Sequence, residues 1–256
     1  MSAYADAPTY HLPRLILRVS GNLYALEISH VREMVRMVEV NPVPHAPDNV
    51  RGVTHRRNRS LTVLDLRRRL GMRGMDEEIQ ELVGILRARE ADHLRWVDEL
   101  EACVREGREF TLARDPGKCA FGVWYAGFRT DNLTLRGHLK RFEQPHARIA
   151  EARETTLAAL RRLFGDAVTL LEESVAETLV ILENGDQLLG LTTDEVDSVE
   201  HLAEGSIREI ALPGDCWHGD LALVRRTAMT ARSDRLVLVL EAEALLSDVG
   251  SLAVMA

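Results

Sequence analysis

The amino-acid sequence predicts an α+β protein in which about a hundred helical residues interrupt a β-rich region. Three observations support this fold class. Residues 14–70 have the alternating pattern of strands, apolar side chains recur three and four residues apart from Met75 onward, and the strand pattern returns at Thr178. A chain of 256 residues also accommodates two domains of ordinary size.

Strand-like segments lie in both the first and the last part of the chain. In the first part they are expected at residues 15–19, 22–28, 37–43 and 60–66, with Gly21-Asn22 as a turn signal. In the last part, hairpins are expected around Asn184-Gly185 and Ser233-Asp234. The two β segments belong most simply to one domain, so the ends of the helical insertion should lie close together.

The middle of the chain has the helical period. A long amphipathic helix is expected from Met75 to about Gly107. A second helical pattern runs from Leu135 to Phe164, where Gly165-Asp166 is expected to interrupt it, and further helix is expected at 167–176.

Composition and charge exclude several function classes. The formal net charge of -8 disfavours binding to a phosphate backbone. No segment approaches the 18 or so uninterrupted apolar residues of a membrane helix, so we expect a cytoplasmic protein that neither binds nucleic acid nor inserts into a membrane. Three scattered cysteines are too few for a disulfide framework, so any special cysteine is a thiol or a metal ligand.

Two histidines lie on the apolar faces of the predicted helices. His93 and His146 should both point inward, although for either one alone a hydrogen-bonded core histidine is the ordinary interpretation. Cys119 stands between them in the chain. Imidazole nitrogen with thiolate sulfur is a donor set that zinc prefers, so the three residues form a candidate metal site.

The motifs around these residues resemble the chemoreceptor zinc-binding (CZB) domain. They are His93-x-x-Trp96, then Cys119-x-Phe121-Gly122-x-Trp124-Tyr125, then Pro145-His146, and the similarity spans about residues 75–175. The resemblance implies a helical bundle with Zn²⁺ as cofactor, held by His93, Cys119 and His146, with Trp96 and Trp124 packing around it. The family is associated with sensing zinc and hypochlorous acid.

The sequence departs from this family at the fourth ligand. The family's last histidine lies four residues after the Pro-His histidine, where this chain has Ala150. Water, Glu151 or His138 could complete the tetrahedron, the site could bind zinc weakly, or it could be a structural relic. An open three-ligand site also suggests a zinc hydrolase, although no H-E-x-x-H arrangement supplies a base.

The β segments resemble the two halves of a CheW domain. The run from Gly52 to Arg67 follows the pattern G-V-x-x-x-R-G-x-x-x-P-V-x-D-L-R, and Leu189-Gly190-Leu191 with Asp194 and Val196 resembles a second pattern that lies one strand ahead of a helix. The resemblance implies a pair of small SH3-like β-barrels that link chemoreceptors to the histidine kinase CheA, interrupted by the helical bundle.

Within this motif, Arg57 and Gly52 are the expected partner-docking residues. Arg57 matches the family's functional arginine, whereas the ordinary alternative is a solvated surface arginine. Asn58 stands where the family has glycine and Thr62 where it has proline; asparagine tolerates a left-handed backbone well.

These inferences give a domain organisation and a function. We expect a first CheW-like part at 10–73, a CZB-like insertion at 74–175 and a second CheW-like part at 176–250. The expected protein is a non-enzymatic adaptor whose partners are a chemoreceptor tip, a CheA-type kinase or both, and whose insertion reports zinc or oxidant through the joints near Arg73-Gly74 and Val175-Ala176. The alternatives are a zinc hydrolase and a plain scaffold with a structural or vestigial metal site.

Overall fold

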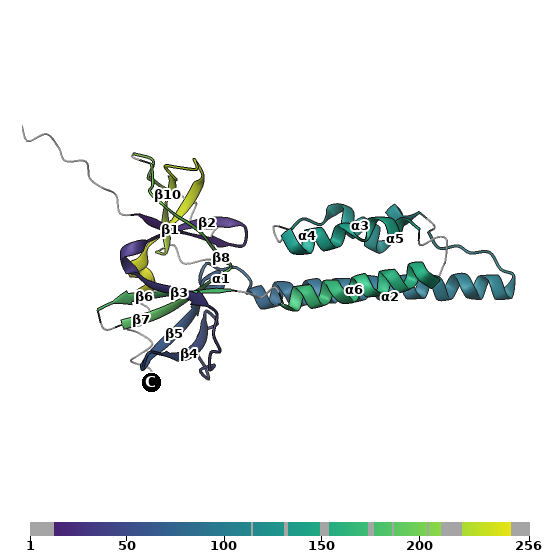
Figure 1. The fold of residues 1–256 in the computed structure, drawn as a ribbon, viewed down its shortest axis with the longest axis horizontal. Coiled ribbons are helices and arrows are strands. Elements are labelled where there is room, and N and C mark those ends of the chain that lie inside the picture. Colours follow the sequence, from purple (N-terminus) through teal and green to yellow (C-terminus); the bar gives the residue numbers. More distant parts are fainter. Residues whose placement is uncertain are drawn as a thin grey trace, which may run out of the picture. The chain divides into compact units, whose positions relative to one another are not determined.

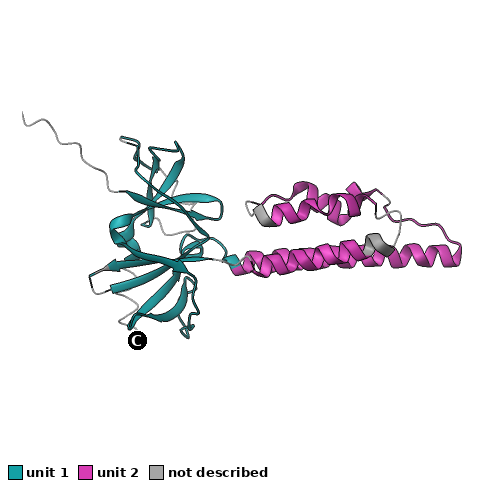
Figure 2. Ribbon diagram, in the orientation of Figure 1, with its two compact units in different colours: residues 1–75, 176–256 teal, residues 76–175 magenta. Residues whose placement is uncertain are grey.

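The chain divides into two compact units. The computed structural model describes residues 13–113, 115–130, 133–148, 154–173, 177–185, 187–203, 205–210 and 222–246. Unit 1 comprises Met1–Met75 and Ala176–Ala256, and unit 2 comprises Asp76–Val175 (Figures 1 and 2). Two β-sheets lie in unit 1 and the long helices lie in unit 2. The predicted mixed α+β class, with its helical region in the middle of the chain, is therefore confirmed.

The first sheet combines two N-terminal strands with four from the last part of the chain. Its strands are β1 (Arg14–Val19), β2 (Asn22–Glu27), β8 (Glu195–Glu200), β9 (Arg208–Glu209), β10 (Val224–Met229) and β11 (Leu236–Leu240), in the order β8-β1-β2-β11-β10-β9. Ser20 and Gly21 join β1 to β2, and both have positive φ angles, as a two-residue hairpin requires. The parallel pair β2–β11 joins the two parts of the chain.

The second sheet is mixed in the same way. Its strands are β3 (Val31–Arg36), β4 (Val50–Arg56), β5 (Arg59–Asp65), β6 (Thr178–Asn184) and β7 (Gln187–Thr193), in the order β3-β6-β7-β5-β4. The short helices η1 (Ile28–His30) and α1 (Leu66–Arg69) follow β2 and β5. Both sheets contribute to one buried cluster that includes Leu17, Tyr24, Leu64 and Leu191. Neither sheet is complete without strands from both sides of the helical segment.

Isolated bridges link strands that lie far apart in the order of each sheet. In the second sheet, where β3 and β4 are the edges, Asn41 follows β3 and bridges to Val53 of β4 through two backbone hydrogen bonds of 2.8 and 2.9 Å. In the first sheet, Leu202 follows the edge strand β8 and bridges to Thr230 after β10. Both sheets therefore curl toward small barrels, which leaves fewer unpaired strand edges.

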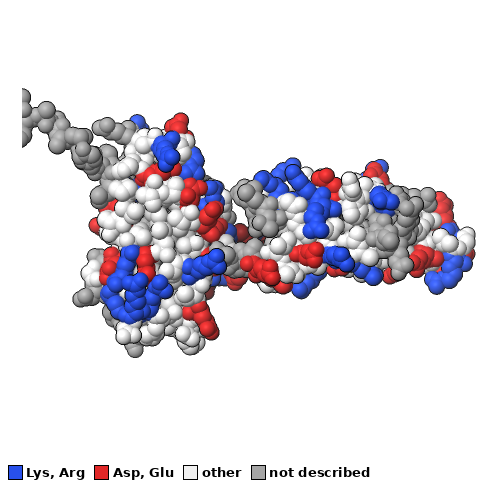
Figure 3. Space-filling view, in the orientation of Figure 1, with Lys and Arg blue, Asp and Glu red and all other residues white. Residues whose placement is uncertain are grey.

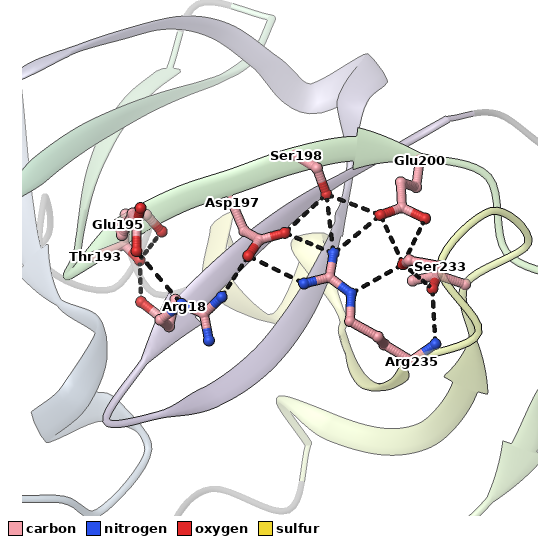
Figure 4. A network of polar contacts seen from close by, with 9 residues as sticks. Arg18, Thr193, Glu195, Asp197, Ser198, Glu200, Ser233 and Arg235 are labelled. Atoms are coloured by element: carbon pink, nitrogen blue, oxygen red, sulfur yellow. Dashed lines mark hydrogen bonds and ion pairs between the residues drawn. The ribbon is translucent and has the colours of Figure 1, made fainter. Parts of the chain in front are cut away.

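A network of charged side chains reinforces the closure of the first sheet (Figure 4). The Arg235 guanidinium donates to the two carboxylate oxygens of Asp197 at 3.1 and 2.6 Å and to Glu200 at 3.0 Å. The Ser233 hydroxyl also donates to Glu200, and Arg18 of β1 pairs with Asp197. Arg235 holds the pKa of Asp197 down at about 2. The turn between β10 and β11 is thereby tied to β8.

Two sequence predictions in unit 1 were wrong. The strand expected at 37–43 lies earlier, at β3, where Val31, Glu33 and Val35 point to the half-buried side. The charged residue Glu33 interrupts the apolar alternation in the sequence. The free-energy cost of partly burying its carboxylate is offset by an ion pair with Arg56. Prolines at 42 and 44 suit the irregular segment that follows. The helix expected after the second CheW-like pattern is replaced by β8.

Unit 2 is built from helices in the range 75–173. They are α2 (Met75–Glu106), η2 (Pro116–Lys118), α3 (Ala120–Gly127), α4 (Leu133–Lys140), α5 (Glu143–Ala147) and α6 (Glu154–Glu173). Their shared core includes Leu86, Phe121, Phe142 and Phe164. Among the residues that the structure describes, no helix is both long enough and apolar enough to cross a membrane.

The first long helix is where the sequence placed it, whereas the second helical pattern is divided differently. Pro145 has no N–H to donate to the carbonyl of Arg141, so a single helix cannot pass through it, and Pro145 lies instead in the first turn of α5. Conversely, α6 runs through Gly165-Asp166 without a break. The buried face continues from Phe164 to Ala167, and this packing outweighs the helix penalty of about 1 kcal/mol for one glycine.

The strands that precede and follow unit 2 in the sequence, β5 and β6, both pair with β7. Thr192 of β7 pairs with Asp65 at the end of β5 on one side and with Leu179 of β6 on the other. The guanidinium of Arg51 links the end of β5 to the residue before β6, because it donates to Asp65 at 3.0 Å and to Glu177 at 2.9 Å. Both carboxylates are almost fully buried, so Arg51 neutralises two charges that water cannot reach.

We predict that Arg51→Ala lowers the free energy of unfolding by about 3 kcal/mol, because it leaves Asp65 and Glu177 buried without their cation. Burial raises the pKa of Glu177 and Arg51 opposes that rise, so the pKa of Glu177 should climb further in the variant. When an acid has a higher pKa in the folded state than in the unfolded state, it destabilises the fold fully above the folded-state pKa. This destabilisation shrinks as the pH falls through the folded-state pKa and is gone below the unfolded-state pKa. The loss should therefore be largest at neutral pH and shrink as the pH falls.

Urea unfolding of both proteins between pH 5 and pH 8 measures this effect. Arg36→Ala, at an exposed position of β3, is the control and should change the unfolding free energy by less than about 0.5 kcal/mol. Equal losses in the two variants, or a loss at Arg51 that does not vary with pH, would contradict the assignment.

Candidate metal centre

Helix α2 holds His93 with one ring nitrogen committed and the other available. The imidazole is buried, and its Nδ1 donates to the carbonyl of Arg89, one helical turn earlier, at 2.7 Å. This bond leaves the lone pair on Nε2, which lies 4.0 Å from the sulfur of Cys119. A hydrogen bond from the other ring nitrogen is the usual way in which a metal-ligating histidine is oriented.

Helix α5 brings the second histidine to the same point. His146 is buried, and its Nε2 lies 3.0 Å from the Cys119 sulfur. Its backbone N–H donates to Phe142, which lies in the core shared with α6. The break at Pro145 therefore does not displace His146, because packing of Phe142 fixes the start of α5.

Cys119 is the N-cap of α3, where its sulfur accepts a hydrogen bond from the backbone N–H of Gly122 at 3.2 Å. Gly122 has a second role: a Cβ atom there would lie 2.0 Å from the carbonyl oxygen of Pro116. Only glycine therefore lets the η2 turn pack against α3 and place the sulfur.

Aromatic rings surround the three residues. The ring of Phe121 lies 4.8 Å from that of His146 and 5.7 Å from that of His93, centroid to centroid. Phe164 of α6 packs on Phe121 and on His93. Trp96 and Trp124 belong to the same cluster as partly buried residues. The expected packing role of the two tryptophans is therefore compatible with the structure.

Burial keeps both imidazoles neutral at pH 7. It lowers the pKa of His93, and burial with His93 nearby lowers the pKa of His146 to about 4. Neutral imidazole is the form that binds a metal ion, so no proton has to leave either histidine near neutral pH.

The donor atoms of His93, Cys119 and His146 fit a zinc ion. They all lie within 4.8 Å of one another. Ligands about 2.0–2.3 Å from a tetrahedral zinc are about 3.3–3.6 Å apart, which falls between the two sulfur–nitrogen distances of 3.0 and 4.0 Å. Two neutral imidazoles and one thiolate are also a donor set suited to zinc.

The candidate fourth ligands do not join this group in the described residues. His138 is buried, and its Nε2 is hydrogen-bonded to the carbonyl oxygen of Leu163 at 2.8 Å. Glu151 and Ala150 lie outside the described residues. Helix α5 ends at Ala147, so the described part of the helix does not extend to position 150. The group found among described residues contains no carboxylate.

Cys103 does not enter the group either. Cys103 is buried in α2 beside Arg108, whose guanidinium lies 2.9 Å from the sulfur. Cys216 lies outside the described residues.

The two expected docking residues have different environments. Arg57 stands at the tip of the β4–β5 hairpin with its side chain 69% exposed, and both Arg57 and Asn58 have positive φ angles. Gly52 is buried at a bulge, with a φ of 139°, and a Cβ atom there would lie 2.1 Å from the backbone oxygen of Asn41. The structure thus presents Arg57 at the surface and gives Gly52 a backbone role in closing the sheet.

Sequence reasoning overlooked Arg89 and the packing role of Gly122. Arg89 acts through its backbone carbonyl, which no side-chain motif reveals, although its position four residues before His93 could have suggested it. Gly122 was noted as part of the Cys119 motif, but its contact with Pro116 depends on the fold of the loop.

Comparisons with known proteins agree with both resemblances. Residues 14–104 match the family model of the CheW-like domain, and residues 93–152 match that of the chemoreceptor zinc-binding domain. The chain therefore combines a region similar to a CheW-like domain with one similar to a CZB domain, which confirms the resemblances noted in the sequence. The two matches overlap within α2.

A search of the solved structures found the scaffolding protein TtCheW from Thermoanaerobacter tengcongensis. It has 15% sequence identity and a TM-score of 0.44, and the match covers 94% of this chain and 89% of that one. No curated protein matched the chain.

We predict that Gly122→Ala weakens metal binding at least about tenfold, because the added methyl group displaces the η2 turn from α3 and moves the Cys119 sulfur. Competition with a chromogenic chelator measures the affinity. Gly127→Ala, at the end of the same helix with open space around it, is the control and should bind like the parent. Unchanged binding in Gly122→Ala would show that the contact with Pro116 does not position the sulfur.

Proposed function

We propose that this chain is a non-enzymatic, cytoplasmic adaptor of chemotaxis signalling that carries its own zinc-thiolate sensor. Unit 1 docks to a chemoreceptor tip, to a CheA-type histidine kinase or to both, and unit 2 binds zinc through His93, Cys119 and His146. The observation that carries this proposal is the convergence of the three donor atoms in a chain whose other region matches the CheW-like domain.

The docking surface proposed for unit 1 lies around the β4–β5 hairpin. One shallow depression there is lined by the charged residues Arg32, Glu33, Arg56, Arg57 and Arg59. Glu183 completes the surface, because it pairs with Arg32 and Arg59, and Glu33 pairs with Arg57. The face of unit 1 in Figure 3 shows such a mixture, with grouped basic side chains and acidic ones at their edge. Arg57 is the most exposed arginine among these ion pairs, and its planar guanidinium suits a carboxylate on a partner.

The sensor chemistry centres on the sulfur of Cys119. Bound zinc would hold Cys119 as a thiolate, which is the reactive form of cysteine. An oxidant such as hypochlorous acid takes two electrons from the sulfur, a sulfur–oxygen bond forms to give a sulfenic acid, and chloride leaves. The oxidised sulfur is a poorer ligand, so oxidation and zinc loss would both free the N-terminus of α3 from the two histidines.

A response requires that the states of unit 2 bias docking by unit 1 differently. The connection on the N-terminal side runs through Arg73-Gly74 into α2, which carries His93. The joint at Val175-Ala176 lies outside the described residues, and the first described residue after it is Glu177, which Arg51 holds.

For the zinc site, we predict that His93→Ala lowers zinc content from near one equivalent to near zero, because it removes one of three ligands. His138→Ala is the matched control, since it removes another buried histidine of unit 2 that lies outside the group, and it should retain zinc. Metal analysis of the purified proteins makes the measurement.

The same samples test the alternatives. Full zinc content in His93→Ala would overturn the ligand assignment, and a parent protein without zinc would favour the plain scaffold. Hydrolysis of esters or peptides by the zinc-loaded parent, lost in His93→Ala, would favour the zinc hydrolase.

For docking, we predict that Arg57→Glu reduces capture of a chemoreceptor tip fragment or a CheA-type kinase at least about tenfold, because it reverses the charge at the centre of the proposed surface. Arg225→Glu reverses an exposed charge in the first sheet and serves as the control. Both variants should unfold within about 0.5 kcal/mol of the parent, since exposed charges contribute little to stability. Equal capture by the two variants would remove the docking role of Arg57.

A further inference from the structure

A cavity of about 340 Å³ lies against the metal centre in unit 2. His93 and Cys119 form part of its wall, and most of the remaining wall is apolar and comes from Trp96, Phe121 and Pro116. Its volume is near the lower end for small-molecule sites, which extend from about 300 to 1,000 Å³. His146 lines a separate cavity of about 250 Å³, so a molecule in the first cavity would approach from the side of His93 and Cys119.

Several polar groups of this cavity already have protein partners. Asp92 pairs with Arg89 and Arg95, and Asp115 accepts a hydrogen bond from the backbone of Gly117 at 2.9 Å. The indole N–H of Trp96 donates to the carbonyl of Ala113 at 2.9 Å. A neutral molecule with a nitrogen donor would therefore bind most strongly at the proposed metal centre.

We propose that this cavity binds a small, uncharged heterocycle of the imidazole class, with its ring against Trp96 or Phe121 and its nitrogen directed at the metal. This inference rests on the proposed zinc site. Three protein ligands with one further position for an external donor is an ordinary zinc arrangement, and imidazole nitrogen is a preferred donor.

The character of the walls selects the class of ligand. Flat aromatic rings favour a planar, apolar molecule. Two aspartates and one arginine line the cavity, which disfavours an anion of the same size. The bound molecule would occupy the approach to Cys119 and should therefore also shield the sulfur from reagents.

The test uses the full chain loaded with Co²⁺, whose absorption spectrum responds to a change of ligand. Adding 4-phenylimidazole should shift the cobalt bands with saturation, and its anionic 4-carboxyphenyl analogue should bind at least about tenfold more weakly. The neutral compound should also slow the alkylation of Cys119 by iodoacetamide, in which the thiolate forms a carbon–sulfur bond and iodide leaves.

A pair of variants locates the binding. Ala113→Trp places a large ring at the cavity and should weaken binding of 4-phenylimidazole at least about tenfold while leaving cobalt affinity within about twofold. Ala126→Trp, at an exposed position of α3 away from this cavity, is the matched control. The comparison of neutral and anionic ligands uses the parent protein alone. A folding defect in one of the two variants would therefore not leave the inference undecided.

The outcomes separate this inference from the proposed function. Cobalt that binds stoichiometrically but whose spectrum ignores 4-phenylimidazole would overturn the cavity inference and leave the metal site intact. Equal binding to Ala113→Trp and Ala126→Trp would also overturn it. A parent protein that binds no metal would remove both proposals.

Discussion

Pairing between strands from the two parts of the chain is the constraint on which the rest of the structure depends. The parallel pairs β2–β11 and β5–β7 and the antiparallel pair β3–β6 cannot form until both parts are present. Parallel pairing requires a long connection, and here the helical unit provides the one between β5 and β7. Because Asp65 and Leu179 flank the same residue of β7, the last strand before the helical unit ends beside the start of the first strand after it. Arg51 neutralises the two carboxylates at that place, so the exit and the return are stabilised together.

The candidate metal centre depends on a similar convergence, but of helices. α2, the N-terminus of α3 and α5 each contribute one donor atom, and each donor is fixed by a neighbouring group: Arg89 for His93, Gly122 for Cys119 and Phe142 for His146. Phe121 contacts both imidazoles and Phe164 of α6, so the candidate ligands share an apolar core with the residues that hold the helices together. Loss of any one ligand would therefore loosen three chain segments at once, which suits a switch better than a purely local site.

The sequence predicted the helix at α2, the inward direction of both histidines and the strands around Asn184-Gly185, because these depend on local periodicity. It failed where tertiary contacts decide the outcome. No local sequence pattern shows that Glu33 of β3 pairs with Arg56. The same is true of the packing at Phe164 that lets α6 continue through Gly165, and of the close approach of Gly52 to the backbone of Asn41. The positive φ of Arg57 was equally hidden, since it follows from the two-residue hairpin loop and not from a preference of arginine. The fourth metal ligand and the domain boundaries stay predictions.

Under the proposed function, the route from the sensor to the docking surface is set by chain continuity. α2 is one uninterrupted helix from Met75 to Glu106, and His93 lies about five turns from its start. A shift at His93 therefore reaches the joint at Arg73-Gly74 with little loss, because a helix resists axial compression. Asp65 caps α1 on the N-terminal side of that joint, and Glu177 begins the return into β6. Both carboxylates bind Arg51, so a displacement of either connection acts on the same guanidinium. A tenfold change in docking requires only about 1.4 kcal/mol of difference between the two states, which is less than the expected cost of removing Arg51 from this ion network. A partial change in this network between the two states would therefore be enough for the coupling, and the network lies in the second sheet, whose β4–β5 hairpin presents Arg57.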